Sequence, residues 1–312
     1  MDTLAVVLKG PEDLRLGRVD LEAPGDGDVI VDVRWSGIST GTERLLYSGT
    51  MPPFPGMGYP LVPGYESVGE VVSAQAGAGL KSGELVFVPG ARCFKDVHAL
   101  FGGAAARLVV PSNRVVPVPA TLGENSVLLA LAATAYHAID CNKPPELVVG
   151  HGVLGRLTAR ITIALGHAPP TVWERASARQ QGARGYQVIA PDADDEKGYN
   201  AICDVSGDAG ILDSLISRLA PAGEITLAGF YSDRVSFAFP RAFMCEARIR
   251  VAAQWQPADL RAVTDLICSG ALALDGLITH RKPAKLAEDA YRKAFADPEC
   301  LKMVLDWRDE TP

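Results

Sequence analysis

The chain has 312 residues, which is long enough for two domains with separate hydrophobic cores. Hydrophobic residues make up 48% and charged residues 21%, and the formal net charge of −7 argues against a nucleic-acid partner and against electrostatic binding to an anionic membrane. The N-terminus lacks the pattern of a signal peptide, and no apolar run approaches the ~18 residues that a transmembrane helix needs. We therefore expect a cytoplasmic protein with no transmembrane segment.

Residues 1–121 are expected to form a partly closed β-barrel, completed by residues 276–312. Short runs rich in β-forming residues alternate there with glycine-containing turns, which is typical of a barrel of short strands. The C-terminal segment is expected to contribute a helix and a strand that fold back onto this domain. The predicted strands are 5–8, 29–33, 67–72, 85–88, 107–110 and 302–305, and the predicted helix is 284–295.

A proline-rich run at residues 51–60 interrupts this pattern. Its prolines lack the N–H donors that a helix or a central strand requires, so we expect an irregular loop. The loop carries the large apolar side chains of Phe54, Met57 and Tyr59, and exposed apolar clusters often mark binding surfaces. We predict that these three side chains line a substrate cleft, and keep open the alternative that they only cap the barrel.

Residues 122–275 show the alternation of strands and helices that predicts a doubly wound parallel sheet. A helix is expected at 125–139, and another follows the glycine-rich motif of residues 150–155. The remaining predicted elements are a helix at 211–219 and strands at 147–149, 171–174, 187–189, 201–205 and 225–228.

The run L-V-V-G-H-G-V-L-G at residues 147–155 predicts a dinucleotide site. An apolar strand leads directly into G-x-G-x-x-G, which permits a tight turn, a close approach of the backbone to a pyrophosphate, and close packing of the next helix. The free N–H groups at the start of that helix favour phosphate binding. The predicted cofactor-binding residues of this loop are Gly150, His151, Gly152, Val153, Leu154 and Gly155, with the His151 side chain expected either to contact the cofactor or to face solvent.

Glu174 closes the second predicted strand, 19 residues after Gly155, where a ribose-binding carboxylate belongs in this motif. Such a carboxylate accepts hydrogen bonds from both ribose hydroxyls and repels a 2′-phosphate, which favours NAD over NADP. Arg175 weakens this prediction because an arginine at this place can hold the additional phosphate.

Several further motifs resemble those of the medium-chain dehydrogenases, the zinc-type alcohol dehydrogenase superfamily. Their order and spacing match over nearly the whole chain, and the resemblance implies a GroES-like catalytic domain followed by a Rossmann domain. It also implies that Thr134, in the helix before the nucleotide-binding strand, contacts the cofactor. The motifs are G-I-S-T-G-T-E at 37–43, G-Y-E-S-V-G-E-V at 64–71, T-A-Y-H-A at 134–138, L-A-P-A-G-E at 219–224 and L-I-T-H-R at 277–281.

The chain departs from that superfamily where the catalytic zinc is bound. Its three zinc ligands align with Ser39, Tyr65 and about Ala130, none of which can replace a thiolate or an imidazole. The four-cysteine structural zinc loop is missing, and the six cysteines contain no C-x-x-C pair. We expect no catalytic zinc; the alternative is a site rebuilt from Cys93, His98 and Glu66.

Within the superfamily, the motifs at residues 37–43, 51–66 and 148–155 together resemble one narrow group, the bacteriochlorophyllide a dehydrogenases of bacteriochlorophyll synthesis. The resemblance implies NAD-linked oxidation of the 3-(1-hydroxyethyl) group of a tetrapyrrole to 3-acetyl. Two rival functions remain: a zinc-free quinone or enone reductase of the same superfamily, and a non-catalytic dinucleotide sensor. A homodimer is left open.

Without zinc, proton transfer must come from side chains. Ser39 and Tyr65 occupy former ligand positions, so their hydroxyls are expected to face the reacting oxygen, unless they only fill the vacated space. Thr40 and Thr42 compete for the place of the superfamily's relay hydroxyl because the motif is one residue longer here. The predicted catalytic residues are Ser39, Thr42, Tyr65, Glu66 as a base or as a support for Tyr65, and His98, whose ordinary pKa suits neutral pH.

Overall fold

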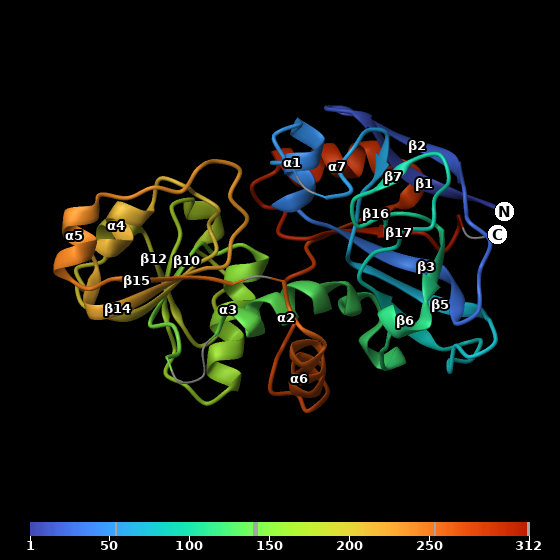
Figure 1. Ribbon diagram of the computed structural model, residues 1–312. Helices are drawn as coiled ribbons and strands as arrows, with labels where there is room; N and C mark the ends of the chain where they lie inside the picture. Colours follow the sequence, from blue (N-terminus) through green and yellow to red (C-terminus); the bar gives the residue numbers. More distant parts are fainter. Residues whose placement is uncertain (54, 140–142, 253, 311–312) are drawn as a thin grey trace. The chain divides into compact units, whose positions relative to one another are not determined.

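The computed structural model describes residues 1–53, 55–139, 143–252 and 254–310 (Figure 1). It consists of two compact units, Met1–Leu129 with Leu277–Pro312, and Ala130–Gly276. The boundary expected near residue 121 falls inside the 3-10 helix η2 (Ala120–Leu128), which contacts strands β3 and β5 and so lies within the first unit. Within the described residues, none of the helices has the length and apolar character needed to span a membrane.

The first unit contains two sheets. The smaller has the strand order β2-β1-β4-β7, and the larger has the order β16-β17-β3-β5-β6-β9, with β8 also paired to β3. The strands of the smaller sheet are β1 (Asp2–Gly10), β2 (Asp13–Asp20), β4 (Leu61–Val62) and β7 (His98–Ala99). Those of the larger are β3 (Asp28–Ile38), β5 (Ser67–Ala74), β6 (Leu85–Val88), β8 (Arg107–Pro111), β9 (Val116–Pro117), β16 (His280–Pro283) and β17 (Met303–Asp306).

The C-terminal segment forms part of this unit. Strand β17 pairs antiparallel with β3, so that Met303 lies opposite Ile38. Helix α7 (Ala287–Ala296) buries one face, including Tyr291, in the core of the unit. The other short elements of the unit are α1 (Thr42–Ser48), η1 (Ser112–Arg114) and η5 (Ala284–Leu286).

The second unit is a six-stranded parallel sheet with the order β12-β11-β10-β13-β14-β15. Numbered along the unit this is 3-2-1-4-5-6, the classical dinucleotide-binding order. The strands are β10 (Leu147–Val149), β11 (Thr171–Trp173), β12 (Gln187–Ile189), β13 (Tyr199–Asp204), β14 (Leu219–Leu227) and β15 (Arg248–Val251). The helices are α2 (Leu129–Ala138), α3 (Val153–Ala164), α4 (Leu212–Ile216), α5 (Phe239–Met244) and α6 (Pro257–Cys268), with 3-10 turns η3 (Ser177–Arg179) and η4 (Pro191–Ala193).

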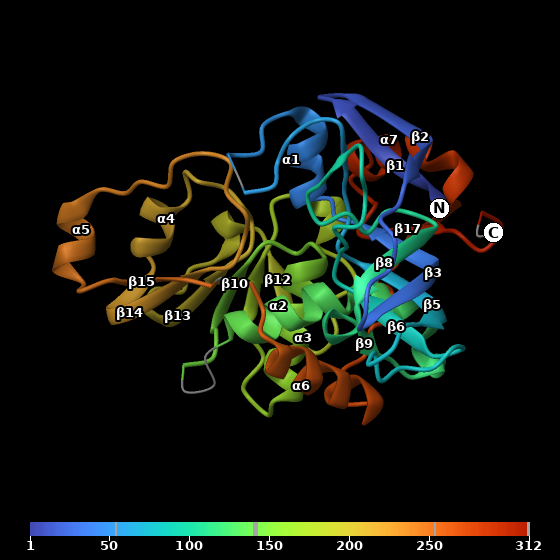
Figure 2. The same cartoon turned by 45° about the vertical axis from the view of Figure 1, so that its right-hand side comes forward.

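Helices cover both faces of this sheet, which is why its strands read as continuous apolar runs. On one face Leu147 and Ile202 pack with Leu215 of α4 and Ala242 of α5, and Figure 2 shows α4 and α5 together on that side. On the other face Val148 packs with side chains that include Ala159 of α3 and Ala138 of α2.

A buried ion pair lies where β17, β3 and β5 of the first unit meet. The Lys302 Nζ, directly before β17, is 2.8 and 2.6 Å from the two Glu66 carboxylate oxygens and donates to the Ile38 carbonyl at 3.2 Å. Both side chains are buried, at 1% and 0% exposure. Gly37 makes room for this pair, since a Cβ at that position would lie 2.1 Å from a Glu66 oxygen.

Replacing Lys302 by methionine is expected to destabilise the protein by about 3–5 kcal/mol, because it leaves the Glu66 charge buried without a partner. Urea denaturation at pH 8 measures the loss. The double variant Lys302→Met/Glu66→Gln should recover much of it, and Lys293→Met, in the more exposed pair with Asp297, should cost less than about 1 kcal/mol. A loss below about 1 kcal/mol for Lys302→Met would contradict the importance of the pair.

Candidate functional site

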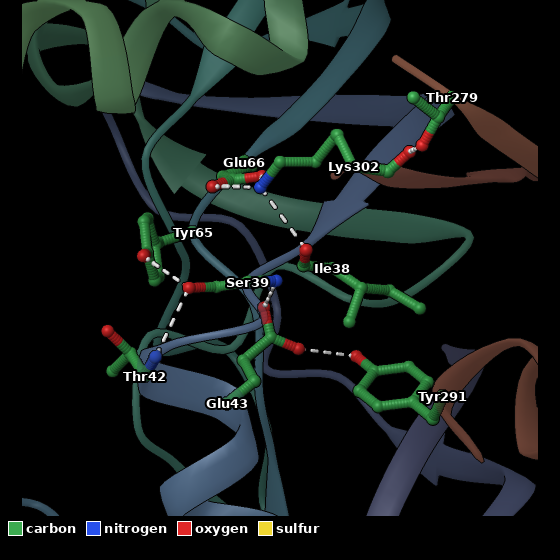
Figure 3. Close-up of polar contacts among 9 residues, drawn as sticks. All are labelled: Ile38, Ser39, Thr42, Glu43, Tyr65, Glu66, Thr279, Tyr291 and Lys302. Carbon is green, nitrogen blue, oxygen red and sulfur yellow. Dashed lines mark hydrogen bonds and ion pairs between the residues drawn. The ribbon is translucent and has the colours of Figure 1, made fainter. Parts of the chain in front are cut away.

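The structure brings together Ser39 and Tyr65, the two hydroxyl residues that the resemblance places at zinc-ligand positions. Ser39 directly follows β3 and Tyr65 lies two residues before β5, and their side-chain oxygens are 2.7 Å apart (Figure 3). The Thr42 N–H, at the start of α1, donates to the Ser39 Oγ at 3.3 Å. Ser39 is buried, and the half-buried Tyr65 ring packs edge-on against Phe101, with 5.0 Å between the ring centroids. The contact is a hydrogen bond suited to moving a proton.

The surroundings of Tyr65 keep its hydroxyl protonated. Burial raises the pKa of Tyr65, and the nearby Glu66 charge raises it further, while hydrogen bonds with Ser39 and Thr42 act in the opposite direction. A tyrosine held neutral is a poor free base. Its oxygen can still accept a proton if its own hydrogen passes at the same time to a hydrogen-bonded acceptor.

Glu66 is engaged with Lys302, although it was predicted as a base or a support for Tyr65. Both of its oxygens accept from the lysine, and Figure 3 shows the carboxylate with Lys302 on one side of Ser39 and Tyr65. Burial raises the pKa of Glu66, and the lysine charge opposes that shift. Glu66 therefore bonds to the lysine ammonium group, and its influence on Tyr65 is electrostatic.

A second buried carboxylate, Glu43, lies on the other side of Ser39. It accepts the Ser39 main-chain N–H at 3.1 Å and the Tyr291 hydroxyl at 2.6 Å (Figure 3). Burial raises the pKa of Glu43 to about 7, against the effect of these two hydrogen bonds. The sequence analysis missed Glu43, Tyr291 and Lys302. Lys302 could have been singled out from the sequence, because it is a lysine directly before the apolar run of β17.

The alternative zinc site is not assembled in the structure. Cys93 is buried and its thiol pKa is raised to about 11 by burial, Glu66 is held by Lys302, and His98 is exposed on β7. No group of three or more His, Cys, Asp or Glu side chains that could hold a metal was found in the described part of the chain. The His98 ring packs instead beside Gly58 of the proline-rich loop, where a Cβ would lie 2.9 Å from it.

The proline-rich loop lies between α1 and β4, and its described residues are irregular, as predicted. Met57 and Tyr59 are half-buried and pack against the core of the first unit, and the Tyr59 hydroxyl donates to the Leu46 carbonyl. These contacts agree with the alternative that Met57 and Tyr59 cap the barrel, because part of each side chain packs against its core. Phe54 lies outside the described residues.

In the second unit, the glycine-rich loop has the form that a pyrophosphate requires. Gly150 has a φ of +104°, and a Cβ on Gly155 would lie 1.8 Å from the Gly150 carbonyl oxygen, so neither tolerates a side chain. A Cβ on Gly152 would meet nothing within 4 Å. Val153 and Leu154 begin α3, whose cap at Gly152 uses no side chain, leaving the N–H groups there to a ligand. The loop therefore fits a dinucleotide.

Glu174 and His151 connect the glycine-rich loop with the segment that follows β11. Glu174 directly follows β11 and accepts the N–H groups of His151 at 3.1 Å and Ala176 at 2.8 Å. The His151 ring does not face solvent: it is buried, with Nδ1 2.6 Å from the Arg179 carbonyl and Nε2 2.9 Å from the Tyr186 hydroxyl. Burial lowers the pKa of His151 to about 4, so the ring is neutral and Nδ1 carries the proton.

The segment after β11 is held by a buried arginine that the sequence analysis did not single out. Arg156 of α3 donates to the carbonyl groups of Arg179, Gln181 and Gly182. Only the short turn η3 lies between β11 and β12 in the described residues, so these bonds order the wall beside Glu174. A charged residue on the apolar face of α3 was the available signal.

The other predicted cofactor residues lie at the surface or within helices. Arg175 is exposed and forms an ion pair with Asp208 at 3.3 Å. Thr134 is half-buried on α2, and its hydroxyl donates to the carbonyl of Ala130, the buried residue at the third former ligand position.

Comparison with known proteins agrees with the fold. Residues 25–120 match the alcohol dehydrogenase GroES-like domain. The acetophenone reductase of Geotrichum candidum in complex with NAD superposes with a TM-score of 0.84 at 20% identity, covering 99% of this chain and 98% of that one. A dehydrogenase of Sinorhizobium meliloti bound to NADP gives 0.81 at 21% identity, covering 98% of this chain and 99% of the other.

A much more similar relative is the 2-desacetyl-2-hydroxyethyl bacteriochlorophyllide A dehydrogenase of Rhodobacter capsulatus. It is 56% identical over 312 residues, and the match covers 99% of both chains. Identity at this level over the full length establishes common ancestry as well as a common fold. The chain belongs to the family of these bacteriochlorophyllide dehydrogenases, within the medium-chain alcohol dehydrogenases.

Proposed function

We propose that the protein oxidises the 3-(1-hydroxyethyl) group of a bacteriochlorophyllide to a 3-acetyl group with NAD. The alcohol loses a hydride from carbon and a proton from oxygen, and the products are the ketone, NADH and a proton. The name of the 56% identical relative and the dinucleotide-type loop of residues 150–155 support this reaction. When bound, the nicotinamide supplies the hydride acceptor.

The observation that carries the proposal is the 2.7 Å contact between the Tyr65 and Ser39 hydroxyls. In the proposed mechanism the Tyr65 oxygen, oriented by its hydrogen bond with Ser39, receives the substrate's proton while Tyr65 passes its own proton to the Thr42 hydroxyl. Thr42 is half-exposed, so its hydroxyl can release a proton to solvent as it receives the one from Tyr65. The paired hydroxyls of Tyr65 and Ser39 are thus proposed to take the place of a metal, with Tyr65 moving the proton and Ser39 holding Tyr65 in position.

We also propose that no catalytic zinc takes part. The residues in the ligand positions support this, because a serine, a tyrosine and an alanine offer no thiolate or imidazole. The substrate lowers the need for a metal, since the reacting carbon is attached to a conjugated macrocycle that stabilises the developing carbonyl group. A positioned acid–base group contributes roughly 10²–10⁴ in rate.

NAD is the proposed dinucleotide rather than NADP. The Glu174 carboxylate is held between two N–H groups beside the phosphate loop, and it keeps lone pairs for the ribose hydroxyls. A 2′-phosphate there would meet this negative charge. Arg175, the residue that could favour the phosphate, is paired with Asp208.

A homodimer is the proposed oligomeric state. Strand β15 is an edge of the second unit's sheet, and open strand edges and exposed apolar patches favour association. The exposed large apolar side chains on β15 and α5 are Phe239, Phe243, Met244, Ile249 and Val251.

Tyr65→Phe is expected to lower kcat by about 100-fold or more, because it removes one hydroxyl of the relay and little volume. Turnover of 3-hydroxyethyl bacteriochlorophyllide with NAD, followed by the absorption of the macrocycle, measures the effect. Ser39→Ala should also lower kcat, whereas Tyr47→Phe serves as a control. A loss below about threefold for Tyr65→Phe, or one tightly bound zinc per chain whose removal abolishes turnover, would overturn the mechanism.

Glu174→Ala is expected to weaken NAD binding by about 10-fold or more, since a hydrogen bond to a charged partner is worth roughly 1.5–3 kcal/mol. Fluorescence titration with NADH measures the affinity. Arg175→Ala, next in sequence and exposed, should change it by less than about twofold. Wild-type protein that binds NADP more tightly than NAD would show that the role given to Glu174 is wrong.

Replacing Phe54 and Met57 together by serine is expected to raise KM for the pigment several-fold and to leave the affinity for NAD unchanged. The reason is that these side chains are proposed to cover the flat apolar face of the macrocycle. Steady-state kinetics test this, with Leu286→Ser, an exposed apolar residue elsewhere in the first unit, as the control. Unchanged pigment kinetics would leave the loop only its capping role.

A further inference from the structure

The Glu43 carboxylate joins two segments of the first unit that are far apart in sequence. Its Oε1 accepts the Ser39 main-chain N–H at 3.1 Å, and its Oε2 accepts the Tyr291 hydroxyl at 2.6 Å. Glu43 and Tyr291 are 0% and 1% exposed. Burying a carboxylate is costly unless donors satisfy it, and here each oxygen has one donor. Such an arrangement calls for an explanation beyond packing.

We propose that Glu43, held by Tyr291, is a positioning residue that fixes Ser39 and thereby aligns the Ser39–Tyr65 hydroxyl pair. This inference rests on the proposed proton-transfer function of that pair. Among the hydrogen bonds of the described residues, neither Glu43 nor Tyr291 contacts the hydroxyl oxygen of Ser39 or Tyr65, so both act through the Ser39 main chain.

Ser39 is the pivot of the arrangement, as Figure 3 shows. Its N–H is bound by Glu43, while its Oγ contacts Tyr65 at 2.7 Å and accepts the Thr42 N–H at 3.3 Å. A movement of the Glu43 carboxylate therefore shifts the main chain that carries the Ser39 hydroxyl. Misplacing a reacting group by about 1 Å can cost on the order of 100-fold in rate.

The arrangement depends on the charge of Glu43. The ionised carboxylate accepts from both donors, whereas protonation turns one oxygen into a donor that competes with Ser39 or Tyr291. The charged and titratable groups that face Glu43 are Tyr291 of α7, Tyr65 of the hydroxyl pair, and Glu66 and Lys302 from the buried ion pair. Because the pKa of Glu43 is about 7, the aligned state should be lost as the pH falls through neutrality.

Stability and alignment depend on pH in opposite directions, so the two effects of Glu43 can be distinguished. The pKa of Glu43 is raised above its ordinary value of 4.5, so the folded protein binds this proton more tightly than the unfolded chain. The contribution of Glu43 to stability is full below about pH 4.5 and is lost as the pH rises through about 7. The difference in melting temperature between Glu43→Gln and wild type should therefore shift in favour of the variant as the pH is raised from 5 to 8.

The experiment compares Glu43→Gln and Tyr291→Phe with Tyr47→Phe, whose ring packs on Phe295 as Tyr291 does. The pH dependence of kcat is measured from pH 6 to 9, together with KM for both substrates. We expect Glu43→Gln to lower kcat about 10-fold at pH 8 and to abolish the acidic limb near pH 7. Tyr291→Phe removes a bond that favours the carboxylate, so its acidic limb should move to higher pH. The Tyr47→Phe profile and all KM values should stay within about twofold of wild type.

Wild-type kcat and an unshifted acidic limb in both Glu43→Gln and Tyr291→Phe would overturn the positioning role. A fall in kcat that follows a fall in melting temperature at every pH would overturn it as well, because that indicates loss of folded protein. If Tyr65→Phe abolishes turnover while these two variants are normal, only the positioning role fails. If Tyr65→Phe is itself fully active, the proposed function of the hydroxyl pair fails.

Discussion

The buried ion pair between Glu66 and Lys302 is the constraint on which the first unit's site depends. It joins the start of β17 to the segment before β5 and reaches the end of β3 through the Ile38 carbonyl. Ser39 and Tyr65 each lie next to one of these anchored residues, so their hydroxyls meet where the strands are tied together. A charged pair with so little exposure requires close geometry, and the absent side chain of Gly37 provides the room.

This arrangement explains how a zinc-type fold can accommodate the proposed chemistry without zinc ligands. In a zinc enzyme the metal both orients the alcohol and stabilises its charge. Here the orientation is proposed to come from hydroxyls fixed by two buried carboxylates, Glu43 behind Ser39 and Glu66 beside Tyr65. The protein needs to stabilise less charge on the reacting oxygen, because the macrocycle stabilises the product carbonyl group. The polar residues around the vacated position thus form an organised network of hydrogen bonds and one ion pair.

In the second unit, too, buried hydrogen bonds position the residues that are proposed to bind the cofactor. Glu174 bridges the phosphate loop and the segment after β11, while Arg156 and the His151 ring hold that segment through its carbonyl groups. A longer helix would satisfy such carbonyl groups by itself, whereas the short turn η3 cannot. Arg156 of α3 therefore supports the segment that lies beside Glu174.

The sequence by itself determined the fold class, the glycine-rich loop and the carboxylate after β11. These features depend on local spacing or on the chemistry of single residue types, such as the glycines at 150, 152 and 155. Only the tertiary structure decided that Glu66 pairs with Lys302, that Glu43 meets Tyr291, and that the His151 ring turns inward. Those partners lie up to 248 residues apart, and their pairing depends on how β17 and α7 return to the first unit. No local pattern records such a return, because the free energy of burying a charge depends on which donors the fold brings to it.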